Sequence, residues 1–87
     1  MITESEIHER IKAYVLDTVL PGEDSSQLTG ATPLVSSGVL DSVGMLRFVS
    51  FLDEEFSISI EAQEIGIENF ETIELITRFV VSKITNF

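Results

Sequence analysis

Few residues of this chain have types and spacing that suit chemistry, and one serine stands apart from the rest. Ser42 follows Asp41, a residue type favoured at helix N-caps, and a helical hydrophobic period begins directly behind the pair. We therefore expect Ser42 at the first position of a helix, beside unsatisfied backbone N–H groups and the positive end of the helix dipole. A phosphate attached to its hydroxyl would lie where helices favour anions. By itself, Asp-Ser also fits an ordinary capping pair.

Other patterns of enzymatic chemistry are absent from the sequence. It contains one histidine, His8, no cysteine, and five glycines that are scattered and do not form a phosphate-binding loop. His8 lies in the first turns of a predicted helix, so an exposed helix residue is favoured over a Ser–His–Asp arrangement. The run Asp53-Glu54-Glu55 lacks the alternating oxygen ligands and central glycine of a calcium loop. We expect no catalytic residue, no metal site and no free-standing enzyme.

Length and charge narrow the class of protein. The 87 residues leave room for one domain, over 1–87, and a hydrophobic content of 44% is enough for a compact core. The formal net charge of −10 disfavours nucleic acid and anionic membranes as partners and favours basic protein surfaces, although it also fits solubility alone. The sequence contains no apolar run long enough for membrane insertion and no recognisable signal peptide. We therefore expect a soluble, cytoplasmic protein.

The first predicted helix lies near the N-terminus. Thr3 and Glu6 form a capping box, apolar residues recur at helical spacing up to Val19, and Pro21-Gly22 ends the helix. The long stretch from Pro21 to Leu40 is irregular. Apolar residues along it indicate an ordered loop and not a linker: Leu28, Leu34, Val35, Val39 and Leu40.

The second predicted helix runs from Ser42 to Phe56, with Asp41 as its N-cap. The run Asp53-Glu54-Glu55 places an acidic patch at its C-terminal end, where the helix dipole disfavours negative charge. Such a patch fits a partner-binding surface, and it also fits a solvated helix face.

The rest of the chain is predicted as a connector and two more helices. Residues 57–60 alternate like a strand without a partner, which indicates an extended connector. A short helix around Ala62–Ile65 ends at Gly66, and we expect it to be the least stable element. The last helix begins near Glu71 or Thr72 and runs toward Ile84, with Asn69 and Glu71 as competing caps. The predicted fold is all-α: a small four-helix bundle of three main helices and one short one, with a long loop between the first two.

The sequence resembles the acyl and peptidyl carrier proteins. Their signature is an Asp-Ser-Leu-like tripeptide at the start of the second helix, matched here by Asp41-Ser42-Val43. The resemblance continues in register over roughly residues 5–85. It includes Thr32-Pro33-Leu34, Ser37-Gly38-Val39-Leu40, the run from Phe51 to Phe56, Ile58 with Ile60, and the run from Asn69 to Ile73.

The resemblance implies that Ser42 carries a 4′-phosphopantetheine arm taken from coenzyme A, with Asp41 as the helix cap beside it. A separate phosphopantetheinyl transferase would attach the arm and supply Mg²⁺. The thiol at the end of the arm would hold cargo as a thioester, which explains a chain without cysteine or catalytic residues. Other implied partners are an adenylating acyl or aminoacyl ligase and downstream oxidase, condensing or transferase enzymes, which a monomer would meet in turn.

The expected recognition face is a stripe of the second helix at three-to-four spacing: Val43, Leu46, Arg47, Ser50 and Glu54. Leu46 is apolar where this stripe should face solvent, and partial burial under the loop is the alternative. Carriers of fatty acid synthesis usually have acids just after the serine, where this chain has Gly44 and Arg47. The sequence is more similar to small free-standing carriers that work with separate adenylating ligases.

We predict an aminoacyl or peptidyl carrier of natural-product biosynthesis. The alternatives within the family are a D-alanyl carrier of cell-wall alanylation and an acyl carrier of fatty acid or polyketide synthesis. Two alternatives belong to other classes: an acidic helical adaptor without a prosthetic group, in which Ser42 is only a cap, and a small hydrolase or isomerase built on His8 and carboxylates. Neither of these two explains why the serine, its cap and the loop residues have the same spacing as in the acyl and peptidyl carrier proteins.

Overall fold

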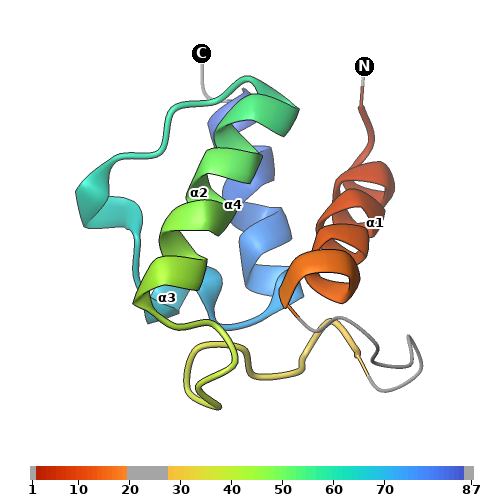
Figure 1. Ribbon diagram of the computed structural model, residues 1–87. Helices are drawn as coiled ribbons and strands as arrows, with labels where there is room; N and C mark the ends of the chain where they lie inside the picture. Colours follow the sequence, from red (N-terminus) through yellow and green to blue (C-terminus); the bar gives the residue numbers. More distant parts are fainter. Residues whose placement is uncertain (1, 20–27, 86–87) are drawn as a thin grey trace.

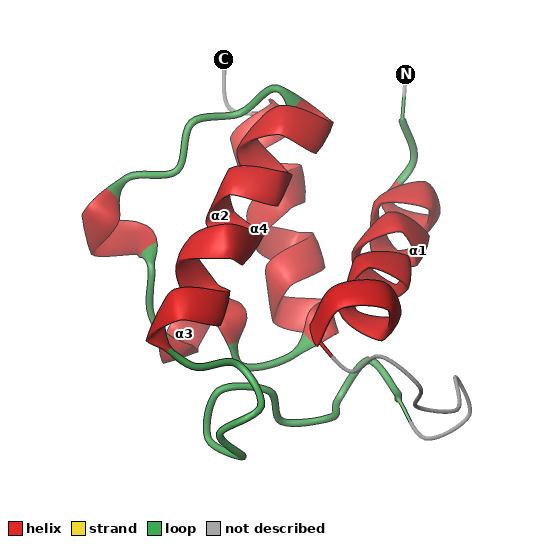
Figure 2. Cartoon of the chain, in the orientation of Figure 1, coloured by secondary structure: helices red, strands yellow, loops and turns green. Residues whose placement is uncertain are grey.

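The computed structural model describes residues 2–19 and 28–85, and its regular elements over these ranges are all helical (Figure 2). These ranges contain four α-helices: α1 (Glu4–Tyr14), α2 (Ser42–Phe56), α3 (Ile67–Phe70) and α4 (Ile73–Thr85). A π-helical turn, Val15–Val19, follows α1, and a 3₁₀ turn, Ala62–Glu64, precedes α3. The helices α1, α2 and α4 form the bundle, and α3 closes it at the end where α2 begins (Figure 1). The predicted all-α bundle with a long loop before α2 is confirmed.

The helix α1 begins with Thr3 as its N-cap, as the sequence predicts, but the Glu6 side chain pairs with Arg10 at 3.6 Å and does not complete the predicted capping box. The Thr3 hydroxyl accepts a hydrogen bond of 3.1 Å from the backbone N–H of Glu6, which satisfies one of the free donors at the helix start. The regular helix ends at Tyr14 and widens into the π-helical turn, which the sequence pattern does not indicate. The predicted stop at Pro21-Gly22 lies outside the described residues.

The helix α2 has the predicted bounds, and two acidic residues at its end have partners within the fold. Asp53 Oδ1 accepts a hydrogen bond of 3.1 Å from the backbone N–H of Ile60, and Glu55 forms an ion pair of 3.0 Å with Arg10 of α1. The sequence predicts either a partner-binding surface or a solvated helix face here, and neither prediction includes these contacts within the fold. Ser57 ends the helix in the left-handed region, with φ at 53°, and the predicted extended connector follows it.

The segment between α2 and α4 differs from the sequence prediction. The predicted short helix is the 3₁₀ turn Ala62–Glu64, and a further turn of α-helix, α3, follows it. Both predicted caps of the last helix are wrong, because Asn69 lies inside α3 and Glu71 contacts the long loop. The cap is Thr72, whose hydroxyl accepts a hydrogen bond of 3.1 Å from the backbone N–H of Leu75.

The core is centred on buried aromatic rings that join the helices. Phe48 of α2 is fully buried, and its ring packs edge-on against Tyr14 of α1 at 4.9 Å and Phe70 of α3 at 6.3 Å between centroids. Phe70 also contacts Phe79 of α4 at 5.8 Å. Edge-to-face contacts of this kind are favourable in addition to the apolar area they bury. They hold α3 against the end of the bundle at which α2 begins.

Candidate functional site

The described part of the loop before α2, residues 28–41, is anchored by buried leucines, as the sequence predicts. Leu28, Leu34 and Leu40 are 3% exposed or less, and each belongs to the same hydrophobic core as the helices. Val35 is partly buried, whereas Val39, also predicted as an anchor, is 37% exposed. The loop therefore reaches α2 with Leu40 fixed in the core directly before Asp41.

Glu71 holds this loop in place, a role that the sequence analysis missed. Its Oε1 accepts hydrogen bonds of 2.9 Å from the backbone N–H groups of both Val35 and Ser36. Its backbone carbonyl accepts a further bond of 2.7 Å from Leu34, whose own carbonyl accepts one of 2.8 Å from Leu40. Hydrogen bonding from Ser36, through its side chain and then its backbone, lowers the pKa of Glu71 below the usual carboxyl value. No local pattern signals a contact across 36 residues.

Replacing Glu71 with glutamine should loosen the loop, because a carboxylate accepts stronger hydrogen bonds than a neutral amide. We expect amide exchange at Val35 and Ser36 to become on the order of fivefold faster at neutral pH. Because the folded pKa of Glu71 is lowered, its contribution is fully present above the unfolded carboxyl pKa and is lost as the pH falls through the folded value. Acidification should therefore lower the protection of these two amides in the wild type, measured relative to the intrinsic exchange rate at each pH.

The matched control is Glu68→Gln, which neutralises an exposed carboxylate on α3. It should leave exchange at Val35 and Ser36 unchanged. Equal acceleration by both variants would mean that general charge, and not the contact of Glu71, protects the loop.

The N-terminus of α2 is built as the sequence predicts. Asp41 caps it, with Oδ1 accepting a hydrogen bond of 2.7 Å from the backbone N–H of Gly44. A Cβ on residue 44 would lie 3.2 Å from that oxygen and 3.4 Å from Leu40, so glycine gives the cap room. Ser42 is the first residue of α2, and it is exposed. The structure thus presents the hydroxyl-bearing residue at a capped helix start.

The predicted stripe of α2 is exposed along its length. Val43 and Leu46 are 59% and 62% exposed, so Leu46 is not buried under the loop. Arg47, Ser50 and Glu54 are exposed as well. Over residues 2–19 and 28–85, four large hydrophobic residues are exposed, and three of them are Val39, Val43 and Leu46. Ser42 is therefore bordered by apolar surface, which is uncommon on a strongly acidic chain.

An open apolar groove begins at Ser42. Its volume is about 550 Å³, and it lies between the loop, the first turns of α2 and the residue that follows the 3₁₀ turn. The lining residues are Val35, Leu40, Asp41, Ser42, Met45, Leu46 and Ile65. Apart from Asp41 and Ser42 at its start, every lining side chain is apolar. The groove can therefore receive a flexible chain attached to the Ser42 hydroxyl.

His8 is not part of this site. It is partly buried and lines a separate depression between α1 and α4, together with Glu4, Ser5, Glu74, Thr77 and Arg78. Its nearest acidic partner is its sequence neighbour Glu9, at 3.9 Å. The part of the chain that the structure describes contains no group of three potential metal ligands, and none of its helices is long and apolar enough to cross a membrane.

The chain is similar in sequence to a known protein of similar size. No protein-family model matches the chain. The chain is 34% identical over 77 residues to the probable acyl carrier protein PigG of Serratia sp. (strain ATCC 39006). The match covers 88% of this chain and 83% of the relative, so the similarity extends over most of both proteins.

Proposed function

Since the chain belongs to the acyl carrier protein family, we propose that it holds an aminoacyl or peptidyl group as a thioester on a 4′-phosphopantetheine arm attached to Ser42. The carrier role follows from the family, whose members carry a phosphopantetheine group in general. Carrier proteins are not enzymes: they present groups that partner enzymes convert. The assignment of Ser42, the aminoacyl cargo and a natural-product pathway are our proposal.

The observation that supports Ser42 most directly is its place at the start of the apolar groove. The residue is exposed at the first position of α2, where a helix favours a phosphate group. Its hydroxyl is the nucleophile that this position offers, and Asp41 holds the first turn while placing a carboxylate beside the Mg²⁺ supplied by the transferase. When bound, the arm supplies a thiol that this cysteine-free chain lacks.

The cargo class is tested by loading the arm and then offering activated groups. The chain is first incubated with coenzyme A, Mg²⁺ and a broad-specificity phosphopantetheinyl transferase, and its intact mass is measured. The loaded form is then given ATP, amino acids and amino-acid-adenylating ligases. A mass gain of one aminoacyl residue supports the proposal. Loading with D-alanine alone would indicate the cell-wall carrier, and loading only by a malonyl transferase would indicate fatty acid or polyketide synthesis.

The exposed stripe of α2 is proposed as the surface that these partners recognise. Arg47 is the one charged residue of α2 before Asp53, in a chain whose net charge is −10. It lies beside the exposed apolar side chains of Val43 and Leu46. A partner that fits this stripe has an apolar contact area and an acidic residue opposite Arg47. The proposed carrier is cytoplasmic. It acts as a monomer, because its arm must reach several enzymes in turn.

Reversing the charge at residue 47 should weaken partner recognition. We expect Arg47→Glu to lower kcat/KM about fivefold for an adenylating ligase that loads the wild type, mainly through KM, since contacts at the edge of an interface act on association. Helical content should not change, because Arg47 is exposed. The matched control is Arg78→Glu, which makes the same charge change on an exposed position of α4. An equal effect of both variants would contradict recognition through α2.

A further inference from the structure

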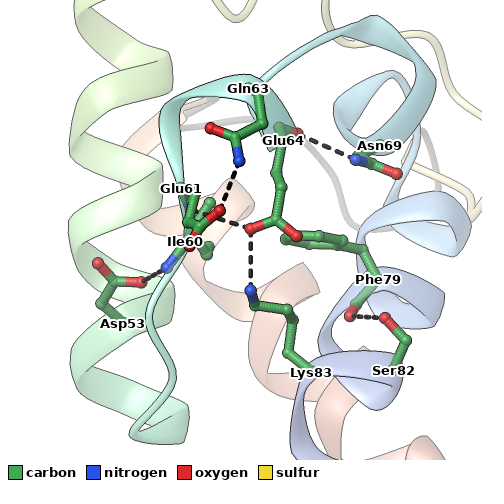
Figure 3. A network of polar contacts seen from close by, with 9 residues as sticks. All are labelled: Asp53, Ile60, Glu61, Gln63, Glu64, Asn69, Phe79, Ser82 and Lys83. Atoms are coloured by element: carbon green, nitrogen blue, oxygen red, sulfur yellow. Dashed lines mark hydrogen bonds and ion pairs between the residues drawn. The ribbon is translucent and has the colours of Figure 1, made fainter. Parts of the chain in front are cut away.

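One wall of the Ser42 groove is formed by a segment that polar contacts hold to three helices. We call residues 60–65 the strap. Asp53 of α2 accepts a hydrogen bond of 3.1 Å from the backbone N–H of Ile60, at the beginning of the strap. Near its end, Lys83 of α4 contacts Glu64 Oε1 at 2.9 Å, and the Asn69 side chain of α3 donates to the Glu64 carbonyl at 2.9 Å (Figure 3).

Glu64 is the residue on which these contacts converge. The oxygen that binds Lys83 also accepts a hydrogen bond of 2.9 Å from the backbone N–H of Glu61, so one carboxylate joins both ends of the 3₁₀ turn to α4. The Lys83 ammonium lies 5.9 Å from the centre of the Phe79 ring, which favours a cation there. The pair is partly covered, with side-chain exposures of 23% for Lys83 and 27% for Glu64.

Apolar packing holds the 3₁₀ turn itself weakly, whereas Ile60 and Ile65 on either side of it pack partly buried against the core. None of the three residues of the 3₁₀ turn is buried, and the turn contains no large apolar side chain. Ile65, the next residue, is partly buried and lines the groove together with Ser42, Met45 and Leu46. The contact that fixes the turn therefore also determines where Ile65 stands relative to Ser42.

We propose that the ion pair between Glu64 and Lys83 is a positioning contact that holds the Ile65 wall of the groove, and that it thereby sets how large a cargo on Ser42 is sheltered from water. The claim about cargo rests on the proposed function. The claim that the ion pair positions Ile65 concerns the chain alone and is tested without the phosphopantetheine arm.

The first experiment measures hydrogen exchange of the full chain without the arm. Lys83→Met removes the cation and keeps an unbranched apolar side chain. We expect exchange of residues 61–66 to become about fivefold faster, with α1 and α2 unchanged. Lys83→Arg should restore the wild-type rates, and Glu64→Gln should resemble Lys83→Met. The matched control is Lys12→Met in α1, which should not affect the strap. Unchanged exchange in Lys83→Met would overturn the positioning role.

The second experiment measures how well the groove protects the thioester from hydrolysis, for a short and a long cargo. A broad-specificity transferase moves acetyl- or octanoyl-phosphopantetheine from the matching acyl-coenzyme A to Ser42 and releases adenosine 3′,5′-bisphosphate. Thioester hydrolysis is then followed by intact mass. In the wild type the octanoyl form should hydrolyse several-fold more slowly than the acetyl form, because only the longer chain reaches the apolar lining. Lys83→Met should bring the two rates together, and Lys83→Arg should keep them apart.

The two experiments fail in different ways. A wild type that cannot be loaded would overturn the proposed function and the cargo half of the inference, while the exchange experiment still decides the role of the ion pair. Equal hydrolysis of both cargoes in the wild type would overturn the sheltering role. A similar rate change for acetyl and octanoyl forms in Lys83→Met would indicate general loosening of the fold, which also contradicts the proposal.

Discussion

Replacing Ser42 with alanine is expected to abolish attachment of the phosphopantetheine arm and to leave the fold intact. The substitution removes one oxygen from an exposed side chain, and alanine is well tolerated inside a helix. The free energy of unfolding should therefore change by no more than about 0.5 kcal/mol. Intact mass after incubation with coenzyme A, Mg²⁺ and the transferase measures the result: the wild type gains one group, and Ser42→Ala gains none.

A second serine provides the control for this experiment. Ser5 is also exposed in the first turn of a helix, two residues behind the Thr3 cap of α1. Ser5→Ala should be loaded as the wild type is, because the groove begins at Ser42 and not at Ser5. Loading of Ser42→Ala would contradict the assigned attachment residue. If the wild type fails to gain mass while a known carrier gains it in parallel, Ser42 is only the first residue of a helix capped by Asp41, and the adaptor hypothesis replaces ours.

Replacing Phe70 with alanine should cause the largest loss of stability. The ring is fully buried and packs against Phe48 of α2 and Phe79 of α4, so its removal leaves a cavity where three helices meet. Substitutions of this kind cost about 3–5 kcal/mol, a large share of the roughly 5–15 kcal/mol that stabilises a domain. Urea unfolding followed by circular dichroism measures the change as a shift of the midpoint.

The control lies on the same short helix. Ile67, three residues before Phe70, is 48% exposed, and Ile67→Ala should cost about 0.5 kcal/mol or less. A similar loss in both variants would mean that helical propensity of α3, and not the packing of Phe70, stabilises this end of the bundle. Because Glu71 directly follows Phe70, the Phe70 variant should also show faster amide exchange at Val35 and Ser36.

The features that the sequence predicts well are local. The bounds of α2 and the caps Thr3 and Asp41 were predicted, because a cap and the N–H group that it satisfies lie three residues apart. The buried leucines of the loop were also predicted, since burial of a large apolar side chain requires no particular partner. The exposure of the α2 stripe follows from the same helical period.

The predictions that failed concern residues whose role depends on distant partners. Glu71 resembles a helix cap in sequence, but its carboxylate meets backbone groups 35 and 36 residues away. Thr72 caps α4 in its place, and α3 forms where Phe70 enters the core. Asp53 and Glu55, read as one acidic patch, have separate partners in the connector and in α1. None of these pairings follows from propensity or period.

The sequence by itself determined the hydroxyl, its cap and the helix that carries them, because short-range hydrogen bonds and a hydrophobic period specify these. The tertiary structure alone decided the groove at Ser42. Two of its walls come from the loop and from Ile65. Glu71 contacts the loop across 35 and 36 residues, and Glu64, directly before Ile65, contacts Lys83 across 19 residues. Such contacts form only once the core has brought these segments together, so no stretch of sequence contains them.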